Sequence, residues 1–105
     1  MEPNTMERYA TTNLVEKIDE EVQRLLWSIM EVFLSETKEP DYLQVFELSI
    51  VIRCDEPMQN IQHRQEVPSL DREVGCFQVT KPYEGIVWVY LDSAGRQTMM
   101  FPEDW

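Results

Sequence analysis

The clearest periodic pattern in the chain lies between residues 18 and 37. Apolar side chains recur there every three or four residues, which places them on one face of an α-helix. They are Ile18, Val22, Leu25, Leu26, Ile29 and Phe33. Asp19 suits the N-cap, and Pro40 disfavours helical geometry at the residue before it. The pattern therefore predicts one amphipathic helix over about residues 19–37.

A second apolar stripe runs along the same helix. At about 100° per residue, Trp27, Met30 and Leu34 fall together, away from the main apolar face. A helix that lies on one sheet needs only one apolar face. The second stripe is therefore either covered by another segment of this chain or exposed as a binding surface for a partner protein.

After Pro40 the pattern changes from helical to alternating. Phe46, Leu48, Ile50 and Ile52 alternate with polar or charged positions, which predicts a strand with one buried face. A turn is expected at residues 55–57, followed by a second strand over about residues 58–67. If the two strands form a hairpin, Glu47 and Arg64 are expected to be cross-strand partners on its solvated face.

The rest of the chain predicts further short strands. Residues 6–12 precede the helix, 74–80 suit an edge strand, 86–91 are apolar on both faces and suit a central strand, and 97–101 return after a loop at 92–95. We predict a single domain over residues 1–105 of the α+β class. In it, one main helix packs on a mostly antiparallel sheet of four to six strands.

The charge balance limits the choice of partner. The 105 residues include 20 Asp and Glu but 9 Lys and Arg, a formal net charge of −11. Because a chain this acidic repels nucleic acid and anionic membranes, we expect it to bind neither directly. It would attract a basic protein, although acidity also serves solubility alone.

Cysteine and histidine usage argues against a metal centre. Cys54 and Cys76 do not form a CxxC pair, and His63 is the only histidine. The N-terminus shows no secretion signal, and isolated cysteines suit a reducing compartment, so we expect a cytoplasmic protein. With three glycines and no phosphate-binding motif, we expect no cofactor.

One constellation is a candidate for chemistry. His63 with Glu66, or with one of the cysteines, would make a small catalytic pair if the fold placed them within hydrogen-bond reach. The alternative is a histidine held by hydrogen bonds inside the sheet. Glu47 and Glu66 would form a carboxylate pair only in a shared cleft, and a solvated face is the simpler interpretation.

Two segments carry a family resemblance. Residues 41–48, Asp-Tyr-Leu-Gln-Val-Phe-Glu-Leu, and residues 61–68, Ile-Gln-His-Arg-Gln-Glu-Val-Pro, resemble the domain of unknown function 960 family. These are small proteins of Gram-positive bacteria and their phages. The resemblance implies a small α+β fold and no particular activity. It draws attention to Glu47, His63, Gln65 and Glu66 without assigning them a role.

The sequence thus favours a non-enzymatic, cytoplasmic interaction protein with a basic protein as its partner. The predicted contact residues are Trp27, Met30, Leu34, Glu47 and Glu66. A protein of this kind, associated with a phage or mobile element, would inhibit a basic nucleic-acid-binding protein by occupying its groove. Two alternatives stay open, namely a small enzyme that uses His63 and a structural homodimer.

Overall fold

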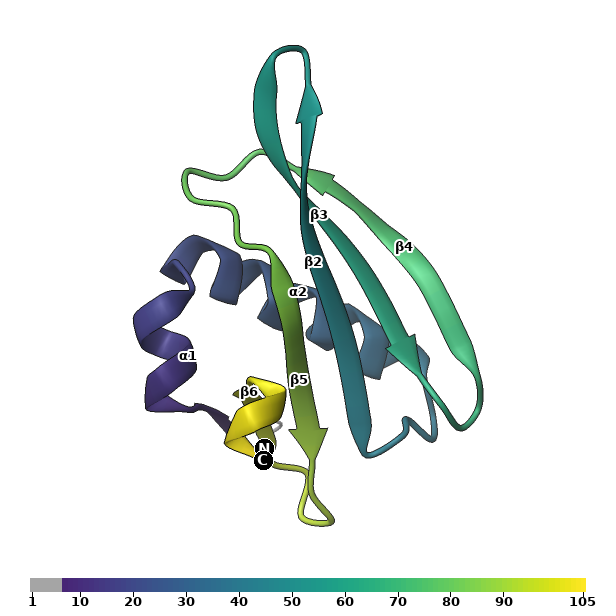
Figure 1. Cartoon of the computed structure of the whole chain (residues 1–105). Coiled ribbons are helices and arrows are strands. Elements are labelled where there is room, and N and C mark those ends of the chain that lie inside the picture. Colours follow the sequence, from purple (N-terminus) through teal and green to yellow (C-terminus); the bar gives the residue numbers. More distant parts are fainter. Residues whose placement is uncertain (1–6) are drawn as a thin grey trace.

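A mixed sheet is the centre of the computed structural model, which describes residues 7–105 (Figure 1). Its strand order is β1-β6-β5-β2-β3-β4. The strands are β1 (Arg8–Ala10), β2 (Leu43–Arg53), β3 (Glu56–Gln65), β4 (Leu70–Phe77), β5 (Gly85–Leu91) and β6 (Gln97–Met100). Among the strands of residues 7–105, only the β1–β6 pair is parallel. The structure confirms the predicted α+β class and mostly antiparallel sheet. Met6, the predicted start of the first strand, lies outside the described residues.

The main helix, α2, runs over Glu20–Glu36 with Asp19 as its N-cap, as the sequence predicted. The Asp19 carboxylate accepts a hydrogen bond from the backbone N–H of Glu21. A shorter helix, α1 (Thr12–Lys17), precedes it and was not predicted. Six residues are too few to show a helical period, and the predicted first strand had been extended through Thr12.

The second stripe of α2 is largely internal. Met30 is completely buried, and Trp27 and Leu34 are half-buried against the core. The guanidinium of Arg8 in β1 lies 5.3 Å from the centre of the Trp27 ring. The prediction that Met30 contacts a partner is therefore wrong, because its whole surface packs within the protein.

Strands β2 and β3 form the predicted hairpin. The turn consists of Cys54 and Asp55, so it begins one residue before the predicted start at residue 55. Both residues have positive φ (51° and 64°). Pro57 lies in β3 opposite Ile52 and not in the turn. It fits there because pairing of β3 with β4 reaches only to Gln59, so the missing N–H interrupts no ladder on that side.

The remaining strands largely match their predictions. β5 pairs with both β2 and β6, so it lies inside the sheet as its apolar sequence indicated. β4 is an edge strand, as predicted, but it begins at Leu70, before the predicted start at residue 74. The charges of Asp71, Arg72 and Glu73 gave no apolar alternation that would indicate a strand, because an edge strand can present charge on both faces.

The two faces of the sheet differ in cover. One face, called the inner face, packs against α2 through buried apolar side chains that include Phe46, Leu48, Ile61, Val87 and Val89. No long helix of the described residues covers the opposite, outer face. Only the short 3₁₀ helix η1 (Pro102–Asp104) and the C-terminal residue lie in front of this face in Figure 1.

Candidate functional site

His63 is completely buried on the inner face of the sheet. Its ring stacks on Phe46 at 4.6 Å and meets the ring of Phe33 edge-on at 4.7 Å. Gln44 Oε1 can only accept, so the His63 Nε2–H donates to it at 2.7 Å. Nδ1 then accepts from the Arg72 guanidinium, whose nearest nitrogen is 3.3 Å away. These contacts fix one neutral tautomer.

The network continues to the end of the hairpin. Gln44 Nε2 donates to Gln65 Oε1 at 2.8 Å, and the same oxygen accepts from the Asp41 backbone N–H at 3.1 Å. Gln65 Nε2 donates to the Pro68 carbonyl at 2.8 Å. The buried amides of Gln44 and Gln65 are thereby satisfied, so His63 and Gln65 have a clear architectural role.

The predicted catalytic pair is not assembled. Burial, and then the charge of Arg72, lower the pKa of His63 to about 4. Glu66 is exposed on the turn after β3, and Cys54 is exposed at the hairpin turn. Cys76 is the strand partner of Asn60, the neighbour of the inner-face residue Ile61. Its thiol contacts Asn60 Oδ1 at 3.8 Å. The proposed pairing of His63 with Glu66 or a cysteine is therefore wrong.

A row of four aromatic side chains occupies the outer face. Tyr42, Tyr90, Trp105 and Trp88 follow one another with ring centres 6.1, 5.0 and 6.2 Å apart. We call these four residues the aromatic row. Tyr42 is 59% and Trp105 68% exposed. The sequence did not indicate the row, because its members come from the residue before β2, from β5 and from the C-terminus.

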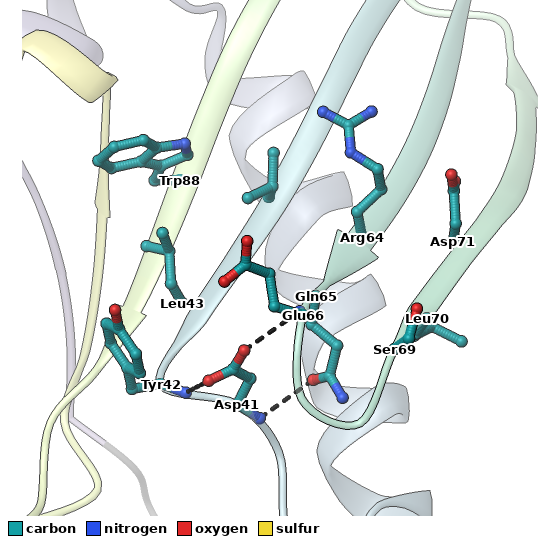
Figure 2. Close-up of a pocket in the computed structure, with 11 residues that line it drawn as sticks. Asp41, Tyr42, Leu43, Arg64, Gln65, Glu66, Ser69, Leu70, Asp71 and Trp88 are labelled. Atoms are coloured by element: carbon teal, nitrogen blue, oxygen red, sulfur yellow. Dashed lines mark hydrogen bonds between the residues drawn. The ribbon is translucent and has the colours of Figure 1, made fainter.

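A groove of about 440 Å³ adjoins the aromatic row (Figure 2). Leu43, Val45 and Trp88 contribute its apolar lining. The polar side chains along it include Asp41, Arg64, Glu66 and Asp71. Figure 2 shows the Glu66 carboxylate directed across the start of β2 toward Leu43. Glu66, predicted as a contact residue, therefore lines this groove, whereas Glu47 is not among its lining residues.

The charges along the groove leave it acidic. Arg64 donates to Glu47 at 2.7 Å, so the predicted cross-strand pair is confirmed, although it is diagonal in register. The Asp41 carboxylate accepts backbone N–H groups of Tyr42, Glu66 and Val67. Within residues 7–105, no hydrogen bond or ion pair engages the carboxylate of Glu66.

Tyr42 also lines a second groove, of about 450 Å³, at the same end of the sheet. Leu34, Pro40 and Tyr90 are among its other lining residues. Leu34 from the predicted helix stripe thus reaches an open surface, and Tyr42 joins that surface to the aromatic row.

The described part of the chain lacks two other features that would indicate a function. Residues 7–105 hold no group of three or more His, Cys, Asp or Glu that is arranged to bind a metal ion. No helix in this range is long and apolar enough to cross a membrane.

The family model described as "Staphylococcal protein of unknown function (DUF960)" matches residues 7–104. The chain belongs to this family. A crystal structure of a protein of unknown function from Enterococcus faecalis is similar in fold, with a TM-score of 0.74 and 19% sequence identity. The match covers 95% of this chain and 91% of the other. No curated protein matches the chain.

In this DUF960 protein, the two segments that carry the family resemblance lie side by side in β2 and β3. Their polar residues lie in two different environments. Gln44, His63 and Gln65 form the buried network, and Glu66 faces the groove. One motif thus supplies both the internal frame and one wall of the open surface.

Proposed function

We propose that this DUF960 protein is a non-enzymatic interaction protein that binds a basic protein through the outer face of its sheet. The observation that carries the proposal is the aromatic row, in which the rings of Tyr42 and Trp105 are exposed to solvent beside an acidic groove. Aromatic residues are enriched at the centres of protein interfaces, where they supply large apolar contacts at a low entropic cost. This surface lies on the opposite side of the sheet from α2, where the sequence had predicted part of the contact surface.

Charge favours a basic partner. The formal net charge of −11 would draw a positively charged protein toward this surface and repel a negatively charged one. Asp41, Glu66 and Asp71 place negative charge next to the exposed rings. In its most specific form, the proposal is that the partner is a cytoplasmic nucleic-acid-binding protein and that this protein competes with nucleic acid for it.

A competition experiment tests the proposal. The protein is immobilised and exposed to cell extract at low and high salt, and every retained protein is identified, purified and assayed for displacement from DNA. We expect basic proteins that are retained at low salt, released at high salt and displaced from DNA. The double variant Tyr42→Ala/Trp105→Ala should lose them.

The matched control is Val32→Ala, which shortens an exposed side chain on α2, on the other side of the sheet. This variant should retain the same proteins as the wild type. Retention by the Tyr42/Trp105 double variant equal to that of the wild type would contradict binding through the outer face.

A homodimer is the second candidate, because the far part of the β2–β3 hairpin exposes apolar side chains next to its charged tip. Figure 1 shows this end projecting beyond the helices. Ile50 and Ile52 point to the inner face there but are 37% and 67% exposed. Light scattering tests this candidate: a dimer that Ile52→Lys converts to a monomer supports it, and a monomeric wild type contradicts it.

A further inference from the structure

We propose that the groove beside Trp88 binds the side chain of one arginine of the partner protein. This inference rests on the proposed function and names the group that the surface recognises. Three properties of the groove support it: its net charge, its apolar wall and the rigidity of its acidic rim.

The groove offers negative charge to a cation. Three of its lining residues are acidic, and the one guanidinium, that of Arg64, is already paired with Glu47 at 2.7 Å. The Glu66 carboxylate is exposed, points across the groove and has no partner within residues 7–105. An incoming guanidinium would therefore find an acceptor that has no competing internal bond.

The apolar wall favours arginine over lysine. Trp88 is half-buried in the groove wall, with Leu43 and Val45 beside it. A guanidinium is planar and weakly hydrated, so it stacks on an indole and still donates in its own plane to a carboxylate. The methylene stem of the same side chain would cover Leu43 and Val45. A volume of about 440 Å³ is ample for this one side chain.

The rim of the groove is held in place before binding. The Asp41 carboxylate accepts the backbone N–H groups of Glu66 at 3.1 Å and Val67 at 3.0 Å. Gln65, on the other side of Glu66, donates to the Pro68 carbonyl at 2.8 Å. The backbone that carries Glu66 is therefore held in place, so that binding has to order its side chain but not the turn beneath it.

The test is a titration of the full-length protein with three blocked tripeptides, followed by NMR. The peptides are acetyl-Gly-Arg-Gly-amide, its lysine analogue and its citrulline analogue, which has nearly the same shape as arginine but no charge. We expect saturable shifts of the Trp88 indole N–H and the Glu66 amide with the arginine peptide. The lysine peptide should bind several-fold more weakly, and the citrulline peptide roughly tenfold more weakly.

Two variants separate the groove from the overall charge. Glu66→Gln should weaken arginine binding by roughly five- to tenfold, since it removes a charge-assisted acceptor. Glu31→Gln removes the same charge from the exposed face of α2 and should leave the affinity within about twofold of the wild type. Amide spectra of both variants establish that the fold is intact.

Three results would overturn the inference: no saturable shift at Trp88, equal binding of arginine and citrulline peptides, or equal losses in Glu66→Gln and Glu31→Gln. Each of these leaves the proposed function standing, because a basic partner can still bind the aromatic row. Failure of the proposed function is recognised separately, when no basic protein is retained at low salt.

Discussion

Nε2 of His63 lies 2.7 Å from Oε1 of Gln44, and neither side chain is accessible to solvent. The contact joins β3 to β2 within the hairpin that both family segments build. On the other side of the ring, Arg72 keeps the imidazole neutral, because a protonated ring would bring a second positive charge next to its guanidinium.

The first prediction concerns acid stability. The folded-state pKa of His63 is lowered to about 4, against 6.5 for the free side chain, so the unfolded state binds the proton first as pH falls. The free energy of unfolding should therefore decrease from about pH 6.5 downward, and the His63 contribution should level off below about pH 4. Over this range the loss is about 3 kcal/mol.

Urea denaturation of the wild type and of His63→Phe measures this contribution, since the acidic residues titrate alike in both proteins. The stability difference between the two should shrink by about 3 kcal/mol as pH falls from 7 to 4. A difference that stays constant with pH would show that His63 does not titrate in this way.

The second prediction concerns the pairing of Gln44 with His63. Gln44→Leu should cost about 2 kcal/mol, because it leaves the Nε2–H of His63 buried without an acceptor. The double variant Gln44→Leu/His63→Phe should lose less than the sum of the single losses, by about 1 kcal/mol. Strict additivity in urea denaturation would mean that the two side chains are not coupled.

The third prediction concerns Asp41 as a tether. Its carboxylate accepts three backbone N–H groups, two of them in the turn between β3 and β4. Asp41→Ala should cost about 2 kcal/mol and accelerate hydrogen exchange at Glu66 and Val67. Glu39→Ala, two residues earlier and exposed, is the control and should change neither quantity.

The fourth prediction concerns the ion pair between Glu47 and Arg64. Both side chains are substantially exposed, at 49% and 37%, so solvent screens their attraction. Glu47→Gln should therefore change the free energy of unfolding by less than about 0.5 kcal/mol, and added salt should reduce even that. A much larger loss would indicate that the pair organises the hairpin.

The fifth prediction concerns the two-residue turn of the β2–β3 hairpin. Cys54 and Asp55 both adopt positive φ, a conformation that Asn-Gly accommodates far better in such turns. Cys54→Asn/Asp55→Gly should raise stability by about 1 kcal/mol, measured as a higher urea midpoint. A lower midpoint would mean that the native side chains make contacts that the turn needs.

Local pattern was sufficient for most of the elements. The helical period located α2 and its N-cap Asp19, and alternation located β2, β3 and the internal strand β5. Those patterns are readable because each element buries one side of a regular backbone. The pattern was insufficient for α1, which is shorter than two turns, and for the start of β4, where charges occupy an edge strand.

The candidate site was only partly predictable. Glu66 was identified from the sequence and does line the groove, whereas Tyr42, Trp88, Tyr90 and Trp105 were not identified as a group. Strand register and the path of the C-terminus bring these rings together, and both depend on contacts between distant segments.

The sequence by itself determined most of the helical and extended segments and that the protein is strongly acidic, because these are properties of neighbouring residues and of composition. Only the tertiary structure decided which apolar side chains stay open. It buried Met30 and left Tyr42 and Trp105 exposed, because α2 packs on one face of the sheet and leaves the other without a long helix. Sequence periodicity cannot show which face a helix will cover, since that choice is made by the packing of the whole chain.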